Sequence, residues 1–369
     1  MSTTNFAANI TNKKQVWVRS LWMAAREEMF INRFVGEGSG AMIQRITEMT
    51  KSEKGEEAII QLVAELVEDG NANDDEREGR EEALNNYELV IQMGLINHGV
   101  RSKGKLADQK SIINFRSMAY DRLKYWLANR LDQLAMLTMS GIAYTSTLDG
   151  RTRSYTTFSS LAFASDVSAP SNKRSLMWDG TALAVSATGS ITSAYTASYK
   201  MLVDAVAYAK THFIRGLKSG GKEYFVFICH PMVVAQLKKD PDYLRAMVAL
   251  ATKSGMDSPW FTGADGVTVD GVVIHSTRLC YNTAGASSGS KWGSGGTVNG
   301  TRCILAGAQA LAMMDLGDPE WAEEKFQYKS QTGINVDKMF GLLKPVFYSQ
   351  VDESEQDFGL LTIDLYLGA

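Results

Sequence analysis

The chain has 369 residues, of which 45% are hydrophobic and 21% are charged, and its formal net charge is −3. This composition is typical of a folded soluble protein with enough core for about two or three domains. The chain has no Lys/Arg-rich tract, which disfavours direct nucleic-acid readout, and no run of about 18 apolar residues, so no membrane span is expected. The N-terminus shows no signal peptide. Its three cysteines form no CxxC pair and indicate buried free thiols in a protein made in a reducing cytoplasm: Cys229, Cys280 and Cys303.

The N-terminal region predicts an arm. Residues 1–12 are polar, and residues 13–34 have the spacing of an amphipathic helix, with Trp17 and Leu21 on the same side as Met29. We expect either a helix packed on the body or an arm that docks on another subunit. The next segment, GEGSGA at 36–41, has no apolar strand before it. It is therefore not a dinucleotide fingerprint, and a flexible joint is predicted.

Two apolar segments, residues 56–67 and 84–100, flank an acidic insert, EDGNANDDEREGREE. The second segment alternates and is rich in Val, Ile and Tyr, which indicates a strand, whereas the first could be a helix by propensity. We interpret the unit as a long β-hairpin with an acidic tip. An isolated two-stranded ribbon is marginal in water, so the hairpin is expected to lie on a neighbouring copy. The tip lacks the glycine and the closing glutamate of a calcium loop, so no metal is expected there.

Residues 105–141 predict one long helix, about 45 Å in length at 1.5 Å per residue. Its N-cap is expected at Asp108 or Ser111, and Gly141 is a suitable residue to end it. A helix of this length is either a central core helix or a spine for elements on both sides. Its apolar residues recur at steps of three and four and predict one buried face: Ile112, Phe115, Ala119, Leu123, Trp126, Leu127, Leu131, Leu134 and Leu137.

The rest of the chain predicts a mixed α/β body. Residues 142–198 are rich in Ser, Thr and Ala and indicate short strands and loops, and residues 283–300 form a Gly/Ser-rich loop. Helices are predicted at 197–216, 232–238 and 240–254. Strands are predicted at 223–229, 267–276 (bent at an Asp270-Gly271 turn), 302–310, 325–335, 341–350 and 357–367.

No catalytic constellation is present. The chain has no phosphate-binding loop, HExxH, GxSxG or CxxC motif. Cys229 and His230 are adjacent, so on a strand they would point to opposite faces and could not form a nucleophile–base pair. We expect a protein that is not an enzyme and has no cofactor.

The order of these elements resembles the major capsid protein of tailed bacteriophages, which has the HK97-like fold. Local stretches are similar to one branch, the coliphage N-four-type family. The stretches are MIQRITEMTK at 42–51 followed by Gly55-Glu56, residues 87–106 with the helix end LDQLAMLTMSG, APSNKRSLMWDG at 169–180, YFVFICHPMVVAQLKKDPD at 224–242, and the closing DFGLLTIDLY. Residues 142–196 and 283–300 match no pattern of that family.

The resemblance implies an α+β HK97-like capsid fold in five parts. These are an N-terminal arm (1–40), an extended hairpin loop with an acidic tip (41–104), a spine helix with part of a peripheral domain and a Ser/Thr-rich insertion (105–222), an axial domain (223–330), and C-terminal strands returning to the peripheral domain (331–369). Contacts between subunits would come from the arm and the hairpin tip. The candidates are Trp17, Trp22, Asp69, Asp74, Asp75, Arg77, Arg80, Glu81 and Glu82.

The resemblance also implies partners and a location. Many copies would form hexamers and pentamers that close into an icosahedral head around double-stranded DNA. Assembly would take place in the bacterial cytoplasm, and the finished chain would belong to the virion. A portal and a separate scaffolding protein are expected, DNA would be contacted non-specifically, and a decoration protein is left open. No membrane partner is expected.

Three alternatives stay open from the sequence. A bacterial encapsulin-like shell protein shares the fold and would enclose an enzyme cargo. A soluble α/β enzyme without a recognisable motif would be a monomer or small oligomer with a deep polar pocket. A tail or adaptor protein would form rings that stay open.

Overall fold

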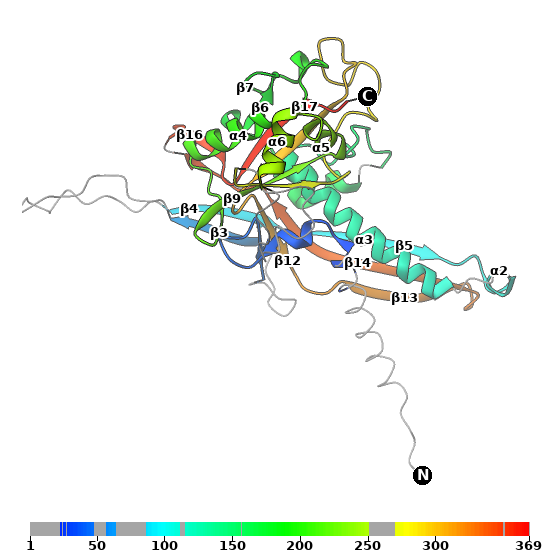
Figure 1. The fold of residues 1–369 in the computed structure, drawn as a ribbon. Coiled ribbons are helices and arrows are strands. Elements are labelled where there is room, and N and C mark those ends of the chain that lie inside the picture. The colour runs from blue at the N-terminus through cyan, green and yellow to red at the C-terminus, as the bar shows by residue number, and fades with distance from the viewer. Residues whose placement is uncertain are drawn as a thin grey trace, which may run out of the picture.

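The computed structural model describes residues 23, 25, 26, 28–47, 57–63, 86–110, 115–155, 157–250, 270–349 and 351–368. In these residues the protein is α+β, as expected (Figure 1). An elongated layer holds the long helix α3 (Phe115–Ser140) over a six-stranded sheet, and a rounder body with a seven-stranded sheet stands at one end of it. None of the helices in the described ranges is long and apolar enough to cross a membrane.

The six-stranded sheet is built around one long strand, β14 (Gln331–Leu343). On one side β14 pairs with β5 (Gly94–Arg101), and its other neighbours are β13 (Glu320–Phe326) and β12 (Leu311–Asp315). Two short strands complete the sheet beyond β12: β2 (Ile43–Ile46) and β1 (Val35–Gly36). Alternate β14 residues join the core under α3, namely Ile334, Val336, Phe340 and Leu342. This period of two is why the strand has one buried face.

The seven-stranded sheet has the order β10-β9-β11-β17-β6-β7, and β8 pairs with β9. Its strands are β6 (Ser175–Trp178), β7 (Leu183–Val185), β8 (Leu217–Ser219), β9 (Lys222–Cys229), β10 (Val272–Ser276), β11 (Gly300–Ala306) and β17 (Leu360–Tyr366). Helices α4 (Tyr199–Thr211), α5 (Pro231–Leu237) and α6 (Pro241–Leu250) accompany it.

The central strands of this sheet separate two hydrophobic cores. In β11, Ile304 packs into the core that contains α3, whereas Cys303 and Leu305 pack into the core that contains α4 and α5. In β9, Ile228 likewise packs into the core that contains α3, and Phe227 packs into the core that contains α4 and α5. Burial on both faces explains why these strands are continuous apolar runs without a polar face.

The predicted hairpin is confirmed in its base. Strands β3 (Glu57–Val63) and β4 (Asn86–Gln92) are antiparallel, with Ile60 opposite Leu89. The expectation of one continuous strand over residues 84–100 was wrong. That stretch divides at Met93 into β4 and β5, which belong to different sheets, because β5 pairs with β14 instead of β3. The acidic tip lies outside the described residues.

The long helix predicted at 105–141 is confirmed over α3. Its first residues form a separate element, α2 (Lys105–Lys110), and residues 111–114, which would have to join the two, lie outside the described ranges. Most of the expected apolar face is buried: Ala119, Leu123, Leu127, Leu131, Leu134 and Leu137. Two details differ from the expectation. Asp108 lies inside α2 and so cannot cap its start. Trp126 is only half-buried and stacks on His98 of β5, with 4.7 Å between ring centroids.

Other predictions hold with small changes of boundary. The three helices after residue 197 are present, and the Asp270-Gly271 turn is confirmed. The loop expected at 283–300 has no helix or named strand up to residue 299, and Gly300 begins β11. The single strand expected at 325–335 was wrong, because the chain turns at Gln327–Lys329 between β13 and β14. The strand expected at 341–350 is broken before Pro345. The remaining elements are β15 (Val346–Ser349), β16 (Ser354–Asp357) and the short 3-10 helices Ile31–Phe34, Thr157–Ser160, Ala162–Ala164, Asn172–Arg174 and Thr188–Ser190.

Candidate assembly surfaces and the contacts that hold them

The intersubunit candidates chosen from the sequence all lie outside the described residues, so the structure neither places them nor brings them together. This holds for Trp17, Trp22, Asp69, Asp74, Asp75, Arg77, Arg80, Glu81 and Glu82. They stay predictions. What the structure shows is how the body holds the segments that lead to them, at the end of the arm and at the base of the hairpin.

The base of the hairpin has one covered face and one exposed face. On β4, Leu89 and Ile91 pack against a small core of the six-stranded sheet, and Tyr87 meets Phe347 of β15 edge to face. On the opposite face, Ile59 and Val90 stand directly across from each other and are 51% and 40% exposed. The hairpin is thus fixed to its own subunit on one side and offers an apolar cross-strand pair on the other.

The end of the arm is held by a buried carboxylate on α3. Asp132 accepts hydrogen bonds from the backbone N–H groups of Phe30 (2.8 Å) and Ile31 (3.1 Å). Burial raises the pKa of Asp132 to about 6, although both N–H donors favour the ionised form. This role could not be predicted from local sequence patterns, because the interacting residues are 102 and 101 positions apart.

A second buried carboxylate joins the arm to the six-stranded sheet. Asp315 pairs with Arg45 (2.8 Å) and Arg26 (3.2 Å), and it also accepts from the ammonium of Lys338. Burial acts to raise the pKa of Asp315, but the charges of Lys338, Arg45 and Arg26 hold it below its usual range. The carboxylate therefore stays ionised and ties three segments of the chain together.

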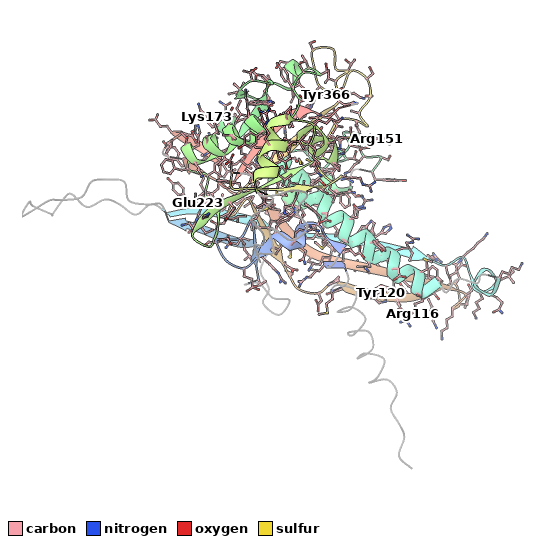
Figure 2. All side chains as sticks on the ribbon, in the orientation of Figure 1. Arg116, Tyr120, Arg151, Lys173, Glu223 and Tyr366 are labelled. Atoms are coloured by element: carbon pink, nitrogen blue, oxygen red, sulfur yellow. The ribbon has the colours of Figure 1, made fainter. Side chains whose placement is uncertain are left out.

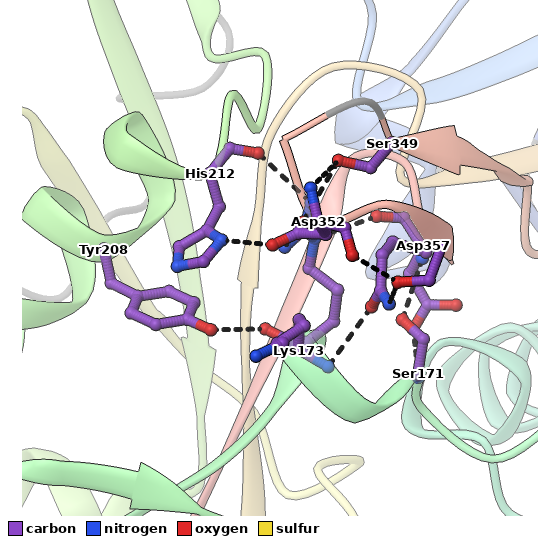
Figure 3. A network of polar contacts seen from close by, with 10 residues as sticks. Ser171, Lys173, Tyr208, His212, Ser349, Asp352 and Asp357 are labelled. Atoms are coloured by element: carbon purple, nitrogen blue, oxygen red, sulfur yellow. Dashed lines mark hydrogen bonds and ion pairs between the residues drawn. The ribbon is translucent and has the colours of Figure 1, made fainter.

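The segment APSNKRSLMWDG, which carried part of the sequence resemblance, lies in a polar network (Figure 3). Arg174 contacts Asp352 (2.9 Å) and donates to the backbone oxygen of His212 (3.1 Å). His212 Nδ1 lies 2.6 Å from the same Asp352 carboxylate. Burial acts to raise the pKa of Asp352, but the His212 hydrogen bond and the Arg174 charge hold it below its usual range.

A buried lysine completes the network. The Lys344 ammonium lies 2.9 Å from Asp357 and donates to the carbonyls of Ser168 and Ala169 at 3.2 Å. Asp357 also accepts from the backbone N–H of Ser171 at 3.2 Å. The network connects the segment after α3 to β16 and α4, so it fixes how the two layers meet. Its ion pairs join residues of different segments, which is a structural role.

The seven-stranded sheet contains its own buried ion pair. Arg302 on β11 and Asp364 on β17 are direct cross-strand neighbours and form two bonds, of 2.8 and 2.9 Å. The same guanidinium donates to the backbone oxygen of Ser140 at 2.9 Å, at the C-terminal end of α3. A cation at this position is favoured by the helix dipole, and the pair fastens the spine helix to the sheet.

The cysteines are buried free thiols, as expected. The sequence could not show that they gather in one place. Burial, with the neighbouring Cys280 and Cys229 thiols, raises the pKa of Cys303 far above its usual range, so it is an unreactive thiol. Within the described residues no group of three or more His, Cys, Asp or Glu could hold a metal ion. His230 caps the start of α5 by accepting from Met232 N–H (3.3 Å), which is a structural role.

The far end of the elongated layer has its own contacts. Figure 2 labels Arg116 and Tyr120 at the start of α3, beside β13. Arg116 pairs with Glu323 at 2.7 Å, and Tyr120 lies against Trp321 with 6.1 Å between ring centroids. Large apolar side chains remain exposed on this subunit, among them Tyr328 at the β13–β14 turn, Tyr155, Phe213 and Leu106. Single exposed apolar side chains are ordinary on a protein surface and do not by themselves mark an interface.

A projecting hairpin, a spine helix and two sheets joined by buried ion pairs define a structural shell subunit with the HK97-like fold. The chain belongs to the family described as "Phage capsid protein", whose profile matches residues 5–368. It is 44% identical to the major capsid protein of Pseudomonas phage KPP25 over 365 residues, which is 98% of this chain and 96% of that one. Its function is accordingly that of a structural major capsid protein, and it is a component of the virion.

Solved capsid structures share the fold. The capsid of Ralstonia phage GP4 superposes with a TM-score of 0.77 at 22% identity, covering 92% of this chain and 91% of that one. The capsid of cyanophage Pam1 superposes with a TM-score of 0.69 at 17% identity, covering 92% of each chain. The family match and the 44% identity to a phage major capsid protein favour the capsid interpretation over the encapsulin, enzyme and adaptor alternatives. The resemblance to the N-four-type branch stays a prediction.

Proposed function

We propose that copies of the chain form hexamers and pentamers that close into an icosahedral head around double-stranded DNA. The observation that carries the proposal is the 44% identity to a phage major capsid protein along nearly the whole of both chains. The exposed Ile59–Val90 pair supports it, because an apolar pair on a projecting ribbon gains stability when a neighbouring subunit covers it. The arm and the hairpin tip would then lie across neighbouring subunits.

The proposal assigns a place to each layer. The six-stranded sheet with α3 forms the main part of the peripheral domain, and the seven-stranded sheet with α4 to α6 forms the axial domain at the symmetry axes. The boundaries proposed from the sequence are 40, 104, 222 and 330. Residue 222 begins β9, but β6, β7 and α4 before it and β17 after residue 330 belong to the same seven-stranded layer, and β12 and β13 before residue 330 belong to the six-stranded sheet. The assignment of the two layers therefore follows the sheets and not these two boundaries.

The proposed partners are a separate scaffolding protein and a portal during assembly, and packaged DNA in the finished head. A net charge of −3 fits weak and non-specific contact with DNA, because strong binding would need many basic residues to neutralise phosphates. A decoration protein on the outer surface is compatible with the proposal. We further propose that assembly takes place in the bacterial cytoplasm and that the chain catalyses no reaction.

Electron microscopy of the purified full-length protein, expressed with and without the candidate scaffolding protein, tests this function. Closed shells, or six-fold and five-fold rings, are expected when the scaffolding protein is present. Uniform small particles under every condition of concentration and salt would overturn the proposal. Shells that form without the scaffolding protein would keep the capsid function and remove the proposed need for that partner.

A further inference from the structure

Two arginines, one on α3 and one in the loop that follows it, share one uncharged hydrogen-bond acceptor, the side-chain oxygen of Gln133. Arg130 donates from Nη1 to Gln133 Oε1 at 2.7 Å, and Arg153, from the loop after α3, approaches the same oxygen with Nη2 at 3.4 Å. The Gln133 amide is itself held in place, because its Nε2 donates to Asn129 Oδ1 at 2.8 Å. The two guanidiniums therefore converge on a fixed point.

No carboxylate among the described residues forms an ion pair with either arginine. The ion pairs among the described residues include neither Arg130 nor Arg153, although Arg151, two positions away, pairs with Asp149 at 3.1 Å. Burial lowers the pKa of both guanidiniums, and the charge of Arg130 lowers the pKa of Arg153 further. Like charges held together on a half-buried surface destabilise the isolated subunit unless an anion joins them.

The surroundings have the composition of a protein interface. Arg153 also donates to Ser146 O at 3.0 Å and lies over the ring of Phe158 at 5.1 Å, so its side chain is held in position. Tyr155 is 81% exposed beside it. Arginine and tyrosine are enriched at the centres of interfaces, because they give large contacts at a low cost in conformational entropy.

The chain carries a matching anion. Residues 68–82 contain eight acidic and two basic residues, a net charge of −6, whereas the whole chain carries −3. This segment lies between β3 and β4, which leave the body on the side opposite Arg151 in the shared view of Figures 1 and 2. The described strands β3 and β4 therefore lie on the other side of the body from the loop that contains Arg151, which favours a neighbouring copy as the source of the acidic residues.

We propose that Arg130 and Arg153, fixed by Gln133, form the receiving site for the acidic segment 68–82 of a second copy of this chain. This inference rests on the proposed shell function and adds the place at which the hairpin tip is held. Two guanidiniums around one point suit bidentate recognition of a carboxylate. The contact also removes the repulsion between them, so the site is more stable in the assembly than in the free subunit.

The test is Arg153→Glu in the full-length chain, with Arg151→Glu as the matched control. Arg153→Glu replaces the repulsion by an ion pair with Arg130, which offsets the lost contacts with Ser146 O and Phe158, so the free subunit should unfold at about the same urea concentration. The yield of closed shells, counted by electron microscopy, should fall at least about tenfold relative to Arg151→Glu. A purely structural role for Arg153 predicts a loss of subunit stability instead, and that result would overturn the proposal.

A charge exchange identifies the occupant. Adding Asp74→Arg and Asp75→Arg to the Arg153→Glu chain should restore shell formation if the acidic segment binds there. Failure of this rescue would overturn the assignment. Normal shells from Arg153→Glu that hold less DNA would also overturn it and indicate a phosphate ligand. The absence of shells from the unaltered chain would instead contradict the proposed function, so the two failures are distinguishable.

Discussion

Gly141 ends helix α3 in a left-handed conformation, with φ of 65°. It also lies against the segment that carries the buried network. A Cβ placed on it would approach Pro170 Cδ and the Ser168 carbonyl oxygen at 2.6 Å each. Glycine is therefore required here for two separate reasons, its backbone conformation and the close approach of residues 168–170.

Gly141→Ala should lower the free energy of unfolding of the free subunit by about 3 kcal/mol, from the left-handed φ together with the overpacking. Gly220→Ala is the matched control. Its φ is 57°, but nothing lies within 4 Å of the added Cβ, so about 1 kcal/mol is expected. Urea unfolding of both variants measures the difference. Equal losses would mean that residues 168–170 move aside without cost.

Asp132 makes the stability of the subunit depend on pH. Its pKa is raised from 3.8 to about 6 mainly by burial, so the folded state binds the proton more tightly than the unfolded state does. The stabilisation is complete below about pH 4 and is lost as the pH rises through about 6, because the buried group must then ionise. A shift of this size corresponds to about 3 kcal/mol.

Asp132→Asn should remove this dependence. The difference in unfolding free energy between the variant and the unaltered subunit should therefore change in favour of the variant as the pH rises from about 4 to about 6, and stay constant above that. Urea unfolding across the range measures it. A difference that is flat with pH would show that Asp132 keeps an ordinary pKa in the folded subunit.

At the scale of elements, prediction succeeded where the signal is local. Helix α3 was predictable because its apolar residues recur at helical spacing and Gly141 ends it. The turn between β13 and β14 was missed because Gln327, Tyr328 and Lys329 all have positive φ without glycine or proline. Pairing of Glu320–Phe326 with Gln331–Asp337 imposes that turn, and a local pattern does not contain such a pairing.

The contacts that hold the candidate assembly surfaces were likewise predictable only where their sequence signal is local. The hairpin base was found from alternation and its acidic insert, both of which are local. The partners of Asp315, Asp352 and Asp364 come from distant strands and helices, so nothing in the sequence joins them. The convergence of Arg130 and Arg153 was missed for the same reason, because the helix and the following loop meet only in the folded chain.

The Arg302–Asp364 pair links two strands and the end of α3. Arg302→Met should destabilise the subunit by about 3–5 kcal/mol, because Asp364 is then a buried charge without its partner. Arg302→Met combined with Asp364→Leu should recover most of that loss, because two apolar side chains replace the pair. Urea unfolding of the single and double variants provides the measurement. A double variant as unstable as the single one would show that the loss of stability comes from the missing hydrogen bond between Arg302 and the Ser140 backbone oxygen, which both variants lack.

At the scale of the molecule, the stable body includes the end of the arm and the base of the hairpin. Ala25, Met29, Ile31 and Phe34 belong to the core that contains α3, and Ile91 of β4 belongs to the small core of the six-stranded sheet. The sheets and α3 share two large cores, and the central strands of the seven-stranded sheet contribute to both. The arm and the hairpin are attached at their ends, through Asp132, Asp315 and the packing of Leu89. A subunit built in this way can fold alone and still depend on its neighbours to cover the segments that leave the body.

Deleting residues 69–82 tests whether the subunit folds without the hairpin tip and still depends on it for assembly. The described residues that form the two large cores all lie outside this segment, so the free energy of unfolding should change by no more than about 0.5 kcal/mol. Assembly should fail or give open, irregular particles, because the hairpin tip no longer reaches the adjacent subunit. Urea unfolding and electron microscopy of the same preparation measure both effects. An uncharged Gly/Ser segment of equal length is the control: if it restores closed shells, the reach of the hairpin matters and its charge does not. If the deletion variant itself forms normal shells, the hairpin tip is not a clamp between subunits.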